Sequence, residues 1–284
     1  MPDIAMRFHK DMLVLSAPIH TALEKQGIDI NLDREFISVI EPEAVRNAYR
    51  LESLAGAQCL VTNTEGITQI RLARINMEDR DAELATAALA IVKSLKPQHI
   101  FAAIGPTHLP LDASSAASLK QNRDQYSWAA RAFGKDSHDA FLLDGMTDSV
   151  DMKCALVGVK KESTLPVFTI LEVDNIINGN IELGGACSMM DEYGADVVGF
   201  ATSADIERVL AIVDVARRVT DRPLLVQLNV LGRTGAYAVP DVMYDAALRL
   251  RNAGVQFLRA GGRVTPAYTA MLVAATSNTD VVSL

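Results

Sequence analysis

The feature that most constrains this fold is a unit that recurs along the chain. A helical pattern ends at a glycine, and a short apolar run follows one or two residues later, as in LAGAQCLVTN (54–63), EYGADVVGFA (192–201) and NAGVQFLRAG (252–261). Glycine suits the end of a helix because it adopts a left-handed conformation without a Cβ clash. The runs are continuously apolar rather than alternating, which is typical of strands in a parallel sheet that is buried on both faces.

Eight runs of this kind predict eight strands, at 12–17, 59–64, 100–105, 140–145, 166–171, 196–201, 223–229 and 256–261. Helical patterns separate most of them, at 42–55, 82–95, 203–219 and 240–253, and a last one lies near 265–277. Pro42 and Pro240 occupy first turns, where proline is tolerated, and Ser203 is expected to cap its helix. This alternation predicts an α/β fold, a (β/α)8 TIM barrel, with a doubly wound open sheet as the alternative.

The chain has no obvious linker or low-complexity segment, so one barrel domain is expected over residues 1–284. Segment 106–127 follows the third strand, is rich in Ser, Ala and Pro, and is a candidate lid or interface. A homo-oligomer is left open.

Composition argues against several classes of partner. The formal net charge is -8, from 35 acidic and 27 basic residues, which argues against nucleic acid or an anionic membrane surface. No apolar stretch approaches the roughly 20 residues of a membrane helix, and the N-terminus does not resemble a signal peptide. The three cysteines match no zinc or disulfide spacing, and their odd number favours a reducing compartment. A cytoplasmic protein is therefore expected.

Barrel enzymes place their active site at the C-terminal ends of the strands, so polar residues there are candidates. Each one taken singly is more often structural; Arg259, for example, is expected to pair with Asp144 or Glu172 as readily as with a ligand. Together they predict a ligand pocket. The candidates are Ser16, His20, Asn63, Thr64, Glu65, Thr107, His108, Asp144, Glu172, Asp174, Thr202, Ser203, Gln227, Asn229, Arg259 and Arg263.

The loops after the last two strands are glycine-rich, NVLGRTG (229–235) and RAGGRVTP (259–266). In many barrels these loops bind a phosphate through backbone N–H groups and a helix N-terminus. Gly261 and Gly262 would let an anion approach the backbone, and Arg233 and Arg263 would add charge. The same glycines would also serve a tight turn.

An ordered set of motifs resembles a known family. These motifs are EPEAVRNAYRLESLAGAQCLVTNTEGIT (41–68), RLARINMEDRDAELATAALAIVKS (71–94), AAIGPT (102–107), FLLDGMTD (141–148), GADVVGFAT (194–202), PLLVQLNVLG (223–232) and GGRVTPAYTAML (261–272). With them the chain resembles the homocysteine S-methyltransferase family, which includes the homocysteine-binding barrel of cobalamin-dependent methionine synthase. The resemblance covers nearly the whole chain, with Asp144 where the family usually has glutamate.

The resemblance implies a zinc site that this sequence does not retain. Members of the family bind zinc through three cysteines, one at the end of strand six and an adjacent pair at the end of strand eight, and the zinc holds the homocysteine sulfur as a thiolate. Here the three positions fall at Thr202, Gly261 and Gly262, while the cysteines of the chain lie elsewhere, at Cys59, Cys154 and Cys187. We therefore predict no zinc at the family position.

Three hypotheses follow. The first is a methyltransferase acting on a thiol or related small acceptor, with Asp144 and Arg259 as catalytic residues. Arg259 or Arg263 would replace the charge of the zinc electrostatically, and any methyl-corrinoid donor would be a separate protein. The predicted substrate-binding residues are Ser16, Asn63, Thr64, Glu65, Thr107, Glu172, Thr202, Asn229, Gly261, Gly262 and Arg263.

The second hypothesis is a TIM-barrel enzyme that binds an anionic or phosphorylated small molecule at the last two loops. Asp144, Glu172 or His108 would then act as acid or base. The third is a non-catalytic relative that binds a metabolite or a partner subunit.

Overall fold

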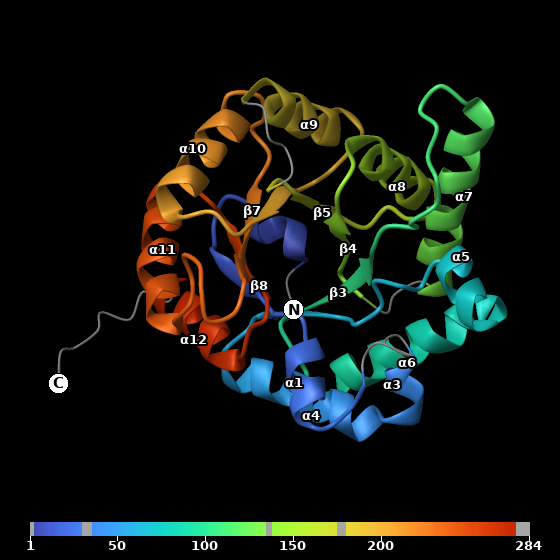
Figure 1. Ribbon diagram of the computed structural model, residues 1–284, viewed down its shortest axis with the longest axis horizontal. Coiled ribbons are helices and arrows are strands. Elements are labelled where there is room, and N and C mark those ends of the chain that lie inside the picture. Colours follow the sequence, from blue (N-terminus) through green and yellow to red (C-terminus); the bar gives the residue numbers. More distant parts are fainter. Residues whose placement is uncertain (1–2, 30–35, 135–137, 175–179, 277–284) are drawn as a thin grey trace.

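The computed structural model describes residues 3–29, 36–134, 138–174 and 180–276. Eight parallel strands close into a barrel in chain order, with β1 pairing with both β2 and β8 (Figure 1). The strands are β1 (Leu13–Leu15), β2 (Cys59–Val61), β3 (His99–Ile104), β4 (Ala140–Met146), β5 (Val167–Glu172), β6 (Val198–Thr202), β7 (Leu224–Val230) and β8 (Phe257–Gly262). All eight predicted strands and the TIM-barrel prediction are confirmed.

Helices surround the barrel and connect its strands (Figure 1). The longer ones are α4 (Pro42–Leu54), α6 (Asp81–Ser94), α7 (Ala116–Ala132), α8 (Ser149–Glu162), α9 (Asn180–Glu192), α10 (Ile206–Arg217), α11 (Pro240–Asn252) and α12 (Pro266–Thr276). The short ones are α1 (His20–Lys25), α3 (Ile37–Ile40) and α5 (Gln69–Leu72), with 3-10 turns η1 (Ile4–Arg7), η2 (Ala73–Ile75) and η3 (Glu78–Arg80).

One local prediction about the helices needs correction. The N-cap of α10 is Asp205, whose side chain accepts a hydrogen bond from the Arg208 backbone N–H at 3.1 Å, so the cap expected at Ser203 was wrong. Segment 106–127, the candidate lid or interface, contains the first part of α7, which packs against α8. Pro42 and Pro240 do lie in first helical turns, as expected.

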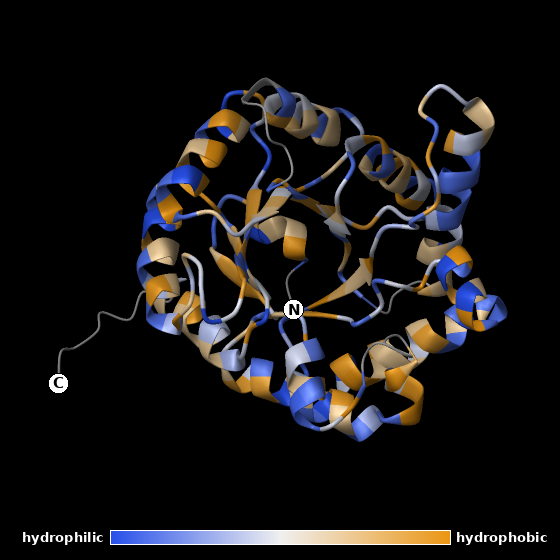
Figure 2. Cartoon of the chain, viewed as in Figure 1, coloured by the Kyte–Doolittle hydropathy of each residue, from blue (hydrophilic) through white to orange (hydrophobic). Residues whose placement is uncertain are grey.

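The apolar core has two parts, one between the strands and the helices and one inside the barrel. Figure 2 shows the corresponding pattern, with apolar strands inside a ring of helices that also carry polar residues. Near the N-terminal ends of the strands, Phe101, Phe168 and Phe257 pack edge to face, with centroids 4.7 and 4.8 Å apart. Phe8 covers them from the N-terminal segment at 5.8 and 5.9 Å, so this end of the barrel is filled by aromatic rings.

Within the described ranges, we find no helix with both the length and the apolar character needed to cross a bilayer.

Candidate functional site

The inside of the barrel changes from apolar to polar toward the C-terminal ends of the strands. Side chains alternate along a strand, so every second residue faces the interior. On β7 the buried Leu225 is followed by Gln227 and Asn229, and on β8 Phe257 is followed by Arg259 and Gly261. The same alternation brings Asp144 of β4 and Glu172 of β5 to this level, where they meet these side chains in the contacts described next.

Arg259 is the centre of this polar layer. Its side chain is 1% exposed, and Nη1 donates to Asp144 Oδ2 at 2.6 Å and to Gln227 Oε1 at 3.1 Å. Its Nε donates to the Ser16 carbonyl oxygen at 3.0 Å. Because β4 and β8 lie on opposite sides of the barrel, the Arg259–Asp144 ion pair crosses the interior. The ion pair expected from the sequence is thus present, with Asp144 rather than Glu172 as the partner.

An amide chain extends from Arg259 to a second carboxylate. Gln227 Nε2 donates to Asn229 Oδ1 at 2.9 Å, and Asn229 Nδ2 donates to Glu172 Oε2 at 3.0 Å. Burial, together with the nearby negative charge of Asp144, raises the pKa of Glu172 from its usual 4.5 to about 7, although the hydrogen bond from Asn229 opposes this. Glu172 can therefore gain or lose a proton near neutral pH.

The two glycines of β8 are required by their neighbours. Gly261 lies opposite Asn229 in the β7–β8 register, and a Cβ on it would lie 2.3 Å from Asn229 Oδ1 and 2.4 Å from Gln227 Nε2. Gly262 has a φ of +74°, which L-residues rarely adopt, and a Cβ there would lie 2.4 Å from the Val230 carbonyl oxygen. The amides of β7 thus occupy the space that a side chain at position 261 would need.

The end of β6 is held by a separate carboxylate. Thr202 Oγ1 donates to Asp174 Oδ1, and the Ser203 side chain and backbone N–H both donate to Asp174 Oδ2, at 2.6 and 2.9 Å. Burial alone would raise the pKa of Asp174, but these hydrogen bonds outweigh it and lower the pKa. Thr202 therefore serves a local turn with Asp174.

Several predicted substrate-binding residues are engaged within the fold. Ser16 Oγ accepts from the Val61 N–H at 3.0 Å, and Thr64 Oγ1 donates to the Ala103 carbonyl at 2.7 Å, so both connect neighbouring strands. Asn63 Oδ1 accepts from Ser38 at 2.9 Å. The Glu65 carbonyl oxygen accepts from the Gly105 N–H at 2.8 Å, and Arg263 is an exposed residue that reaches Glu24 at 3.5 Å.

Sequence reasoning missed a buried network between α7 and α8. Asp151 Oδ1 accepts from Tyr126 Oη at 2.7 Å and from Asn122 Nδ2 at 2.6 Å. Asn122 Oδ1 accepts from Thr107 Oγ1 at 2.6 Å, so the network holds the turn after β3 and accounts for Thr107. The only available signal was the spacing of four between Asn122 and Tyr126, which places both on one face of a helix.

The side chains offer little to a zinc ion at the position that the sequence resemblance would assign to it. Glycine contributes no donor, and Thr202 offers a neutral hydroxyl that is already bonded to Asp174. The three cysteines are buried and lie on different elements, Cys59 on β2, Cys154 on α8 and Cys187 on α9. Across the part of the chain that the structure describes, no group of three or more His, Cys, Asp or Glu residues could hold a metal. The donor set does not fit zinc.

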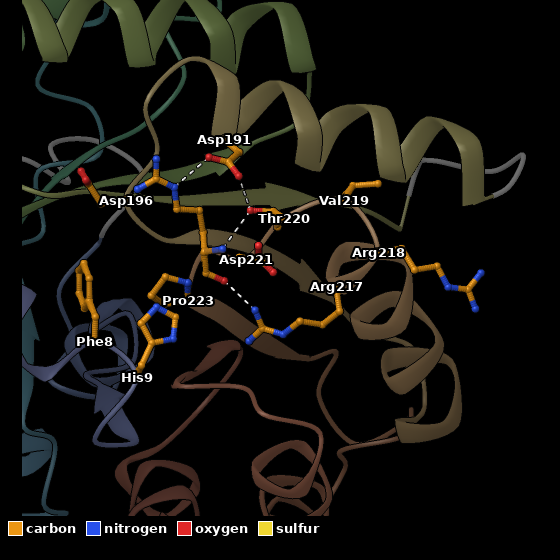
Figure 3. Close-up of a pocket in the computed structure, with 11 residues that line it drawn as sticks. Phe8, His9, Asp191, Asp196, Arg217, Arg218, Val219, Thr220, Asp221 and Pro223 are labelled. Atoms are coloured by element: carbon orange, nitrogen blue, oxygen red, sulfur yellow. Dashed lines mark hydrogen bonds and ion pairs between the residues drawn. The ribbon is translucent and has the colours of Figure 1, made fainter.

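A pocket with a cavity volume of about 620 Å³ lies at the opposite end of the barrel, between α9, α10 and the N-terminal segment (Figure 3). Its polar groups largely bind one another: Asp191 accepts from Arg222 at 2.8 Å and from Thr220 at 2.6 Å, and Arg217 donates to the Arg222 carbonyl at 2.7 Å (Figure 3). These contacts connect α9 and the end of α10 to the segment before β7. They give Asp191, Arg217 and Arg222 partners within the protein, so these side chains have a structural role that requires no ligand.

Comparisons with known proteins agree with the fold and with the sequence resemblance. The family model described as Homocysteine S-methyltransferase matches residues 13–276. Methionine synthase of Mycobacterium tuberculosis is 24% identical over 285 residues, covering 89% of this chain and 24% of that protein. Methionine synthase of Mycobacterium leprae is 24% identical over 182 residues, covering 58% and 15%. This chain thus spans at most about a quarter of the curated relatives it matches.

Among solved structures, the homocysteine methyltransferase MmuM from Escherichia coli superposes with a TM-score of 0.75 in its metallated form and 0.78 in its oxidized form. Each is 17% identical and covers 94% of this chain and 96% of its own. At that identity the likeness supports the fold.

Proposed function

Because the chain belongs to the homocysteine S-methyltransferase family, we propose that it is a methyltransferase that transfers a methyl group to a thiol or related small acceptor without the family zinc. The observation that carries this proposal is the polar layer at the C-terminal ends of the strands, formed by Asp144, Glu172, Gln227, Asn229 and Arg259. Buried charges are costly, and such a layer contributes less to stability than apolar packing would, which favours a role in ligand binding.

The residues divide the work as follows in this proposal. The Arg259 guanidinium provides positive charge beneath the acceptor and is held in place by Asp144 and the Ser16 carbonyl. Fixed charges and dipoles in a site with little water stabilise developing charge without reorganising. The amides of Gln227 and Asn229 orient the acceptor, and Gly261 leaves these amides the space that they occupy.

The proposal also covers the methyl donor and the cellular setting. The donor is either a small methylated compound or a methyl-corrinoid. Because the methionine synthase relatives are much longer than this chain, a corrinoid would be carried by a separate protein or another part of the same one. We place the protein in the cytoplasm, with a small-molecule substrate and neither nucleic acid nor a membrane as a partner.

The anionic-ligand alternative has less support. The glycines of β8 lie in the β7–β8 ladder, and the Arg263 N–H donates to the Val230 carbonyl at 2.9 Å rather than pointing at a ligand. The Arg263 side chain reaches Glu24, which reduces the charge it can offer an anion.

The test combines elemental analysis of the purified protein with calorimetric titration of homocysteine, with and without a zinc chelator. We expect zinc well below one equivalent and homocysteine binding that the chelator does not change. Asn229→Ala should weaken binding roughly tenfold by removing one hydrogen-bonding amide. The exposed Asn252→Ala at the end of α11 serves as the control.

Stoichiometric zinc whose removal abolishes homocysteine binding would contradict the zinc-free proposal. Absence of homocysteine binding at any zinc level would contradict the acceptor class.

A further inference from the structure

Glu172 differs from the other carboxylates at the C-terminal end of the barrel. Asp144 forms a 2.6 Å ion pair with Arg259, and Asp174 accepts hydrogen bonds from both Thr202 and Ser203. Within the described residues, Glu172 forms no ion pair. Its Oε2 accepts a hydrogen bond from Asn229 Nδ2 at 3.0 Å. Its neighbours therefore leave Glu172 as the carboxylate whose proton can be exchanged during a reaction.

The Asn229 amide connects Glu172 to the end of β8. The Asn229 side chain that donates to Glu172 Oε2 through Nδ2 also lies 2.3 Å from the Cβ position of residue 261 through Oδ1. One amide group thus separates the carboxylate from Gly261, the residue that the sequence resemblance aligns with a zinc ligand. Glu172 ends β5 and is only partly buried, unlike the five residues before it on the strand.

The charges around Glu172 come from three elements. Asp144 on β4 and Asp174 just beyond β5 raise its pKa, while Arg259 on β8 lowers it. The residues that β7 places against it, Gln227 and Asn229, do not titrate, and β6 ends at Thr202. Asp144 is held in its ion pair with Arg259, so Glu172 is the carboxylate of this layer that is left to exchange a proton.

We propose that Glu172 is the general base of this enzyme, which removes the proton from the acceptor as the methyl group is transferred. This inference rests on the proposed function. In it, Glu172 deprotonates the acceptor thiol, which a zinc ion would otherwise activate. The acceptor S–H loses its proton to a Glu172 oxygen, and the sulfur electron pair forms the new S–CH3 bond. The donor is a methylsulfonium compound, whose C–S bond breaks so that the electron pair stays on a neutral thioether. The proton then passes from Glu172 to water.

A methylsulfonium donor suits the charges of the layer. Its single buried cation, Arg259, is neutralised by Asp144, and Glu172 adds negative charge. A cationic donor is therefore attracted, and its positive charge disappears in the transfer.

The experiment measures methionine formed from homocysteine and either of two methylsulfonium donors, S-adenosylmethionine or trimethylsulfonium, between about pH 5.5 and 8.5. The base acts when ionised, so kcat should rise with pH through an apparent pKa near 7. Glu172→Gln should lower kcat by roughly 100-fold or more and remove this rise, with little change in the KM for homocysteine. Glu172→Asp should keep the rise at a reduced rate.

Glu162→Gln is the matched control, because Glu162 pairs with Arg131 on the surface at the end of α8. It should leave both the rate and the pH profile unchanged. If the wild type is active and the Glu172→Gln variant is equally active, the general-base inference is overturned and the proposed function stands. Homocysteine binding without transfer from either donor would overturn the inference as well, while leaving the zinc-free binding proposal. Absence of homocysteine binding would overturn the proposed function.

Discussion

At the scale of single residues, the two glycines at the end of β8 shape this site. Gly261 leaves room for the Gln227 and Asn229 amides, and Gly262 takes a backbone conformation that L-residues rarely adopt. A cysteine at either position would meet the same obstacles, since the clash begins at the Cβ. The amides of β7 therefore exclude any larger side chain from position 261 unless they move.

Gly261→Ala should destabilise the protein by about 1–3 kcal/mol, because the added methyl overpacks against two amides that are hydrogen-bonded to other groups. The measurement is chemical denaturation of both forms. Gly185→Ala is the control: its Cβ would meet nothing within 4 Å in α9, so it should stabilise by up to about 1 kcal/mol. A Gly261→Ala variant as stable as wild type would mean that the amides move aside at no cost and that position 261 can hold a ligand.

At the scale of elements, the α7–α8 pair supports the site indirectly. Tyr126 and Asn122 of α7 share the Asp151 carboxylate of α8, and Asn122 continues to Thr107 after β3. Burial raises the pKa of Asp151, and the hydrogen bonds from Tyr126 and Asn122 counteract this by stabilising the ionised form. The network therefore fixes the turn after β3 against two helices.

Tyr126→Phe should cost about 1–2 kcal/mol of unfolding free energy, because it removes a donor from a buried carboxylate. Since the donor stabilises ionised Asp151, the loss should be smaller at acidic pH, where that carboxylate becomes protonated, than at pH 8. Tyr244→Phe on α11 is the control, and thermal unfolding at the two pH values is the measurement. An equal loss at both values would show that Asp151 does not titrate with the network.

The elements were predictable to different degrees for physical reasons. Continuous apolar runs located all eight strands, because a strand covered on both faces has no polar positions to obscure it.

The roles of the polar residues at the strand ends were harder to predict. Ser16 and Thr64 were predicted to bind substrate, yet both bond to neighbouring strands. The sequence does not say whether a hydroxyl faces a ligand or a backbone group, and it gave no sign that Asp151 would join α7 to α8.

Across the whole molecule, the polar layer connects strands that are not neighbours. Arg259 and Asp144 join β8 to β4 across the barrel, and Asn229 and Glu172 join β7 to β5 past β6. These contacts link strands on different sides of the barrel, at the C-terminal side of its apolar interior.

Arg259→Met should cost about 3–5 kcal/mol, because it leaves the Asp144 carboxylate buried without its partner. Arg259→Met combined with Asp144→Leu should recover most of this loss, since the pair is replaced by apolar groups. A double-mutant cycle of unfolding free energies measures the difference. If the double variant is as unstable as Arg259→Met alone, the main contribution of Arg259 is its bonds to Ser16 and Gln227.

The aromatic filling at the other end of the barrel has a consequence for how the protein is made. Phe8 lies near the start of the chain, but the rings it covers, Phe168 and Phe257, are synthesised much later, and β1 also depends on β8 for one of its two neighbours. During synthesis, the segment around Phe8 must therefore remain without its final partners until β8 has emerged from the ribosome. The barrel can close around Phe8 and β1 only after its last strand has been made.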